Sequence, residues 1–208
     1  MQLRRIQVLP MLCLALLLPR CQEDRTESEA GAGLDPTPTL VLETTKGRIV
    51  IEMDREKAPL TVANIVRHVE IGFYDSLTFY RVKSGFMIQA GSFTADLRRR
   101  SSSAKPILNE ADNGLSNRRG TVAMARTEYI HSAETDFFIN LVDNYKLDYG
   151  VYPDGWGYAV FGRVIEGMDV VDAIAAVPVR PRRPTFEALP VEPIVITRAY
   201  LIDEEPAS

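Results

Sequence analysis

The sequence predicts a mainly β domain, an antiparallel sheet closed on itself with helices covering the open ends. Short β-branched or alternating apolar segments, separated by turn residues, recur from about residue 40 to residue 203. Two further segments have helical spacing, and they do not alternate regularly with the strands. A parallel doubly wound sheet would require that alternation, so we expect antiparallel pairing instead.

The first predicted elements are a hairpin and a helix. Residues 40–54 contain two β-branched runs around the turn signal TTKGR. Residues 58–75 follow, where Val62, Ile65 and Val69 recur at helical spacing. A proline near the start of this segment and a glycine near its end are typical of helix boundaries.

The remaining elements lie on both sides of a long irregular segment at residues 92–119. Before it, FYRVKSGFMIQAG (79–91) indicates two short strands joined by KSG. After it, the apolar patterns predict strands and a second amphipathic helix, at 120–126, 136–142, 158–165 and 193–202 for the strands and at 167–177 for the helix.

The N-terminal segment has the pattern of an export signal. Arg4 and Arg5 precede an apolar run from 6 to 18, which is shorter than the roughly 20 residues that span a bilayer. A charged start and a short apolar stretch are typical of a secretory signal, so residues 1–21 are predicted to be a signal peptide. An uncleaved anchor or a buried helix is the alternative. We expect an exported protein of the periplasm or cell envelope.

Cys21 is the candidate lipid-attachment residue. It directly follows the apolar run and resembles the lipid-modified cysteine of a bacterial lipoprotein. Such signals normally carry a small residue before the cysteine, whereas this chain has Pro19 and Arg20. If Cys21 is acylated, the protein is tethered to a membrane.

The rest of the chain divides into a tether, a folded domain and a short tail. Residues 22–39 are acidic, small and proline-bearing, which predicts a disordered tether. Residues 40–203 form the predicted domain, which we expect to be monomeric, and 204–208 form the tail. The net charge of −4 does not favour a nucleic-acid partner, which requires a basic surface. The one basic cluster, at 97–103, is predicted to be a solvated loop.

Several chemistries find no support in the residues. Both cysteines lie within the first 21 residues, so the domain has no disulfide. Its two histidines, His68 and His131, have no neighbouring cysteines and make a poor metal site. Neither a hydrolase elbow nor a cofactor motif is found. The acidic pair Glu110 and Asp112 is better explained by turn capping than by catalysis.

Two polar residues in the apolar segment 79–91 are unexpected. Alternation could place Arg81 and Gln89 beside aromatic and thioether side chains. Either both are ordinary outward-facing residues, or they belong to a site that needs a cation and an amide against an apolar floor. The residues alone leave both explanations open.

Four segments, taken in order, resemble the cyclophilin family of peptidyl-prolyl cis–trans isomerases. They are FYRVKSGFMIQAG, GTVAMAR, DFFINL and YAVFGRVIEGMDVVD, and the intervening NEADNGLSNRRGT is similar to bacterial periplasmic members. The resemblance covers roughly residues 40–203. It implies an eight-stranded antiparallel closed barrel capped by two helices, with a groove on its outer face for proline-containing polypeptides and no cofactor.

The resemblance also implies a role for each motif residue. Arg81 is the catalytic arginine by this likeness. The substrate-binding residues that it implies are Phe86, Met87 and Gln89 along the groove, Ala125 and Arg126 through main-chain contacts, Asp136 beside them, Phe137 and Leu147 at the proline pocket, and Tyr158 in place of a histidine of many eukaryotic members.

The sequence departs from the family pattern at three positions. Asp136 stands where most members have glutamine, and it could pair with Arg81 or Arg126 or change which residues are accepted before proline. Lys146 replaces an aromatic residue, so we expect low sensitivity to cyclosporin. Ala90 replaces a glycine, a mild change if its φ is negative.

Two functions compete on this basis. The first is an enzyme that accelerates X-Pro rotation in exported proteins during folding, which retention of Arg81, Phe86 and Gln89 favours. The second is a non-catalytic module that holds proline-containing segments, for which Asp136 and Lys146 leave room. A purely structural domain would require a blocked groove, and no sequence feature indicates one.

Overall fold

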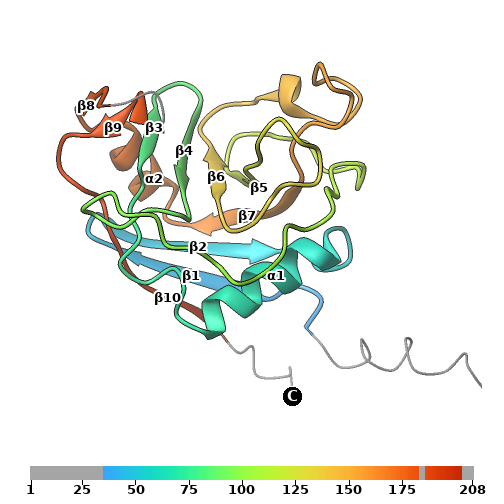
Figure 1. Ribbon diagram of the computed structural model, residues 1–208, viewed down its shortest axis with the longest axis horizontal. Helices are drawn as coiled ribbons and strands as arrows, with labels where there is room; N and C mark the ends of the chain where they lie inside the picture. The colour runs from blue at the N-terminus through green and yellow to red at the C-terminus, as the bar shows by residue number, and fades with distance from the viewer. Residues whose placement is uncertain (1–34, 183–185, 203–208) are drawn as a thin grey trace, which may run out of the picture. The chain divides into compact units, whose positions relative to one another are not determined.

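The computed structural model of the chain describes residues 35–182 and 186–202. Within these ranges it contains an eight-stranded antiparallel sheet, a separate two-stranded sheet and two α-helices (Figure 1). The mainly β prediction with two helices is therefore confirmed. The strands of the large sheet are β1 (Thr39–Thr44), β2 (Gly47–Met53), β3 (Arg81–Lys83), β4 (Met87–Ala90), β5 (Thr121–Met124), β6 (Phe137–Asn140), β7 (Val160–Glu166) and β10 (Ile196–Ile202).

The large sheet curls but does not close, so the prediction of a closed barrel is wrong. Its strand order is β10-β1-β2-β7-β5-β6-β4-β3, which leaves β10 and β3 as the two ends. The segment before β3 meets the segment before β10 at one isolated bridge, between Thr78 and Val195. Beyond it the chain turns away, because the Tyr80 N–H bonds to the carbonyl oxygen of Gln89 and not to β10. The ladder therefore stops after a few main-chain bonds.

The two helices cover different parts of the sheet. Helix α1 (Pro59–Glu70) packs against β10, and α2 (Met168–Ala175) packs against β2. The carboxylate of Glu110 accepts hydrogen bonds from the first main-chain N–H groups of α1, at Leu60 (2.9 Å) and Thr61 (2.8 Å). These groups have no partner inside the helix, so the carboxylate caps it. Glu110 was expected to cap its own turn, and in the structure its carboxylate caps a helix 49 and 50 residues away instead.

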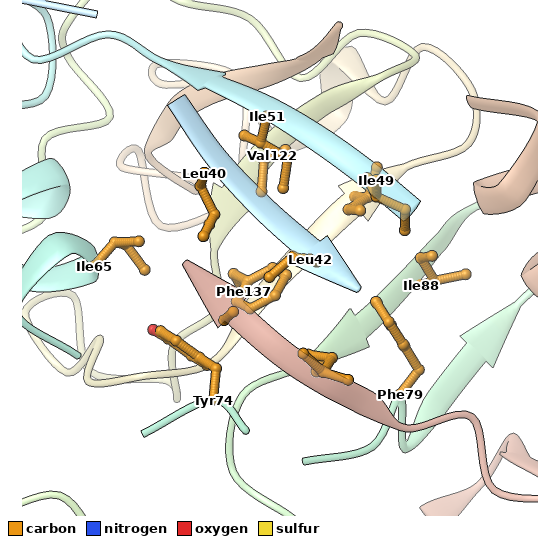
Figure 2. Packing of buried hydrophobic residues seen from close by; sticks show 14 of the residues in the cluster. Leu40, Leu42, Ile49, Ile51, Ile65, Tyr74, Phe79, Ile88, Val122 and Phe137 are labelled. Carbon is orange, nitrogen blue, oxygen red and sulfur yellow. The ribbon is translucent and has the colours of Figure 1, made fainter. Parts of the chain in front are cut away.

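The interior of the curled sheet is filled with apolar side chains from both sheet and helix. Figure 2 shows Leu40 and Leu42 of β1, Val122 of β5 and Ile65 of α1 pointing into the same space. Phe137 of β6 lies among them, with 2 % of its surface exposed. This burial stabilises the sheet that carries the outer face.

Residues 186–190, here called the strap, run along the outer edge of β3. Strands β8 (Val179–Arg180) and β9 (Leu189–Pro190) form the small sheet, and β9 contacts β3 (Figure 1). Phe186 is 1 % exposed and packs with Tyr80 and Leu189 in a separate aromatic cluster. The strap is thus fixed to the edge strand on which Arg81 lies.

Candidate active site

Arg81 begins β3 and reaches the outer face of the sheet. Register explains its neighbours, because Arg81 pairs with Gln89 of β4 and Gln89 pairs in turn with Phe138 of β6. Directly opposite residues in antiparallel strands present their side chains on the same face. The alternation that looked unusual in the sequence therefore places a cation, an amide and an aromatic ring side by side.

These three residues border a cavity of about 560 Å³. Its floor is apolar, since Met87 is 1 % exposed, Phe138 4 % and Leu147 6 %. Phe86 lies at the edge and is partly buried. Such a cavity, with a charged group beside an apolar floor, suits a small ring and a polar bond.

The guanidinium of Arg81 is oriented by several contacts. Its Nη1 lies 3.3 Å from Gln89 Oε1 and 3.8 Å from the sulfur of Met87. Gln89 in turn donates from Nε2 to the hydroxyl of Tyr80. On its other edge, the guanidinium donates a hydrogen bond from Nε to Oε1 of Glu187 at 2.9 Å. The Arg81 side chain remains 25 % exposed.

The aromatic ring at the cavity is Phe138, so the placement expected for Phe137 is wrong. Phe137 pairs with Ala90, whose side chain faces the interior, and its ring packs against Tyr74 at 5.6 Å. Phe138 is paired with Gln89 and lines the cavity. Consecutive residues of a strand point to opposite faces, so only one of the two phenylalanines can reach the groove.

Asp136 does not line the cavity either. Its Oδ2 accepts a hydrogen bond from the Ser92 hydroxyl, and its Oδ1 is buried without a hydrogen-bond partner among the described residues. Burial raises the pKa of Asp136 to about 6, and the hydroxyls of Ser92 and Tyr80 oppose that rise. The expected ion pair with Arg81 or Arg126 is absent from the described structure. The carboxyl is therefore buried beside the Ser92 hydroxyl rather than exposed at the cavity.

Arg126 is held in place by contacts of its side chain. Its Nη2 pairs with Asp154, and its Nε donates to the Gly157 carbonyl oxygen at 2.9 Å. The guanidinium lies 4.9 Å from the ring centroid of Tyr158 and 5.5 Å from that of Tyr152. With 3 % of its side chain exposed, Arg126 fixes the loop that carries these residues against the cavity.

Three more of the predicted residues lie at the cavity, namely Ala125, Leu147 and Tyr158. Ala125 and Tyr158 both line the cavity, and the Ala125 N–H donates to the carbonyl oxygen of Asp136 at 2.9 Å. Burial raises the pKa of the Tyr158 hydroxyl to about 12, so it stays protonated at neutral pH. Leu147 reaches the cavity from a single 3₁₀ turn, η1 (Tyr145–Leu147).

Lys146 lies on the same turn and also lines the cavity. Its Nζ is 5.2 Å from the centroid of the Phe86 ring. A cation over an aromatic face is attractive, but it provides no flat apolar wall. The position expected to carry an aromatic residue therefore presents a charge at the rim.

Besides Phe138, four residues at or near the cavity were not found from the sequence. Val151, Tyr152 and Pro153 belong to the turn-rich loop after η1 and form one wall. Glu187 approaches from the strap that follows β8. Turn residues predicted the loop, but no periodic signal in the sequence indicates which of its side chains fold back.

The alanine at position 90, where the family has a glycine, causes no backbone strain. Ala90 is not among the non-glycine residues of the described chain that have positive φ. The glycine that follows, Gly91, has a φ of 127°, and a Cβ there would lie 2.4 Å from the Thr135 carbonyl oxygen. The close approach of β4 and β6 therefore needs glycine at 91 and not at 90.

Comparison with known proteins identifies the family. The model of the cyclophilin type peptidyl-prolyl cis-trans isomerases matches residues 39–201. The chain belongs to the cyclophilin family. It is 52 % identical over 165 residues to a peptidyl-prolyl cis-trans isomerase of Streptomyces antibioticus, covering 79 % of this chain and 98 % of that one. It is 47 % identical over 154 residues to peptidyl-prolyl cis-trans isomerase B of Escherichia coli, covering 74 % and 93 %.

Solved cyclophilin structures share the fold. A cyclophilin of Hirschia baltica superposes with a TM-score of 0.65 at 25 % identity, covering 83 % of this chain and 77 % of its own. A cyclophilin type isomerase of Cryptosporidium parvum gives 0.66 at 19 % identity, covering 81 % and 99 %. The family catalyses proline isomerisation, and this cyclophilin is a peptidyl-prolyl isomerase whose substrates are proline-containing peptides.

Three expectations concern the N-terminal part of the chain. The signal peptide, the tether up to residue 34 and Cys21 lie outside the described residues. Within residues 35–182 and 186–202, no helix has the length and apolar character needed to cross a membrane. The same ranges contain no cluster of three or more acidic, histidine or cysteine side chains suited to a metal.

Proposed function

We propose that isomerisation takes place in the cavity beside Arg81 and that Arg81 is the catalytic residue. An X-Pro bond must cross a barrier of about 18–20 kcal/mol because resonance resists twisting of the C–N bond. No covalent step is needed. When the amide twists, the proline nitrogen regains a lone pair, and a fixed donor near it stabilises the transition state more than the ground state.

The guanidinium suits this task for two reasons. It stays charged at any physiological pH and presents several N–H donors in a rigid plane. Its Nη1 lies over the apolar floor, 3.8 Å from the Met87 sulfur, so it faces the space that a proline ring would fill. An apolar, water-poor site strengthens a charge-assisted hydrogen bond. This position of Nη1 is the observation that carries the proposal.

The floor residues would hold the pyrrolidine ring. Met87, Phe138 and Leu147 offer apolar surface, while Phe86 closes one side. Tyr158 and Ala125 also line the cavity. Holding the ring while the preceding residue rotates lowers the entropic cost of reaching the twisted state.

The test is a cis-to-trans assay on an Ala-Pro peptide with the wild-type protein and Arg81→Ala. We expect a clear acceleration by the wild type and a loss of about 100-fold in kcat/KM for the variant, which corresponds to about 2.7 kcal/mol. A folded wild type that binds the peptide without accelerating isomerisation would instead show a proline-peptide-binding module.

We further propose that the enzyme acts on exported polypeptides during folding. The charged and apolar N-terminal pattern supports export, and Cys21 is the lipid-attachment residue of this proposal. Labelled-lipid incorporation and cell fractionation of wild type and Cys21→Ser would test both points. Label in the variant would exclude Cys21, and a cytoplasmic wild type would exclude export.

A further inference from the structure

The charged edge of Arg81 that faces away from the cavity is occupied by Glu187. Glu187 Oε1 lies 2.9 Å from Arg81 Nε and 2.8 Å from Nη2. These are the lengths of charge-assisted hydrogen bonds. The contacts of Nη1 with Gln89 and Met87 are longer, 3.3 and 3.8 Å, and define the direction of the guanidinium less strictly. Glu187 is therefore its firmest contact.

Glu187 is in turn fixed by a second cation. Lys83 Nζ lies 2.8 Å from the same Oε1 atom. Lys83 and Arg81 are two residues apart in β3, so their side chains leave the strand on the same face. Hydrogen bonds from Lys83 and then from Arg81 lower the pKa of Glu187, which keeps the carboxylate ionised at neutral pH. Because two cations share one carboxylate, the cluster of Arg81, Lys83 and Glu187 keeps a net positive charge toward the cavity.

The main chain on both sides of Glu187 is also held. The Val82 N–H donates to the carbonyl oxygen of Ala188 at 2.9 Å, which ties the strap to β3. On the other side, the ring of Phe186 packs against Phe93 at 5.0 Å and Tyr80 at 6.1 Å. A carboxylate between two such anchors is pre-organised, so little entropy is lost when it binds the arginine.

We propose that Glu187 is a positioning residue for isomerisation. It holds the Nε and Nη2 edge of Arg81 so that Nη1 stays over the floor of the cavity, and it makes no contact with substrate. This inference rests on the proposed role of Arg81. Without Glu187 the guanidinium keeps its charge but regains rotamers that point Nη1 away from the proline nitrogen.

The chain offers a matched control pair. Glu52 Oε1 accepts from Arg163 Nε at 3.0 Å and lies 2.7 Å from Nη2, the same arrangement on β2 and β7. Neither residue lines the cavity beside Arg81. Steady-state kinetics on an Ala-Pro peptide would compare the wild type with Glu187→Ala, Glu187→Gln and Glu52→Gln.

We expect Glu187→Ala to lower kcat about tenfold with KM changed less than about twofold, since the lost interaction matters mainly in the transition state. Glu187→Gln should lose about threefold, because its amide oxygen still accepts a hydrogen bond but carries no charge. Glu52→Gln should match the wild type. A Glu187→Ala variant as active as Glu52→Gln, or more active than the wild type, would overturn the inference.

A second measurement separates positioning from other effects. The Arg81 Nε–H proton, followed by NMR without substrate, should exchange with water faster in both Glu187 variants and unchanged in Glu52→Gln. A kcat loss without faster exchange would mean that Glu187 acts through its charge alone, and would overturn the inference. If Glu187→Ala does not fold, Glu187→Gln decides by the same two criteria. Because exchange needs no turnover, it still reports on Glu187 if the wild type proves inactive, which would refute the proposed function instead.

Discussion

The buried carboxyl of Asp136 should contribute more to the stability of this protein in mild acid than at neutral pH. Its Oδ1 is buried without a hydrogen-bond partner in the described structure, and burial raises its pKa from 3.8 to about 6. The folded protein therefore binds this proton more tightly than the unfolded chain does. Lowering the pH from about 6 to about 4 favours the folded state through this group, and raising the pH above 6 removes that stabilisation.

The magnitude follows from the two pKa values. A difference of about two pKa units between folded and unfolded states corresponds to about 3 kcal/mol, on the order of a third of the total stability of a typical domain. Asp136→Asn removes the charge and keeps the shape, and its amide oxygen can still accept from Ser92. The unfolding free energy of the variant minus that of the wild type should be about 3 kcal/mol larger at pH 7 than at pH 4.

Urea unfolding of both proteins at several pH values from 4 to 8 is the assay. A control is Asp143→Asn, because Asp143 is exposed and the Arg119 main-chain N–H is the main cause that lowers its pKa. That variant should therefore lose stability relative to the wild type as the pH rises, the opposite direction. If the difference in unfolding free energy between Asp136→Asn and the wild type stayed constant with pH, the assignment of a buried carboxyl with a raised pKa would be refuted.

Three further predictions concern the cavity. Phe138→Ala should lower kcat/KM about tenfold in the peptide assay, whereas Phe137→Ala should cost about 3–5 kcal/mol in unfolding free energy; the reverse pattern would contradict the assigned faces. Lys146→Trp should bind cyclosporin about tenfold more tightly than the wild type, since it adds an aromatic wall, and equal, tight inhibition of both would contradict this. Asp154→Ala leaves the Arg126 side chain, 3 % exposed, without its carboxylate, so urea unfolding should show a loss of about 3 kcal/mol; no change would mean that the ion pair does not hold the loop.

The groove illustrates which site residues could be found from the sequence. Arg81 and Gln89 stood out because a cation and an amide interrupt an apolar alternation, and the family motif assigned them to one face. The structure places both at the cavity, along with Phe86 and Met87 from the same stretch. Residues within one hairpin are positioned by local alternation, so a local pattern is enough to group them.

The choice between Phe137 and Phe138 required the register between strands. Both lie in a fully buried strand that begins with three apolar residues, so the sequence offers no alternation there to tell inside from outside. The pairing of Phe138 with Gln89 decides it, and that pairing joins segments about 50 residues apart. Asp136 was misplaced because its contact with Ser92 joins segments 44 residues apart, which no local pattern indicates.

The sequence by itself predicted the mainly β class and both helices, because these depend on periodicity, whereas Arg81 was assigned to the site by the family resemblance of its motif. Only the tertiary structure decided that the sheet stays open, which phenylalanine faces the groove, and that Glu187 reaches Arg81 across 106 positions of the chain. Such contacts depend on strand register and on where the strap packs, and the local sequence pattern of a single segment indicates neither.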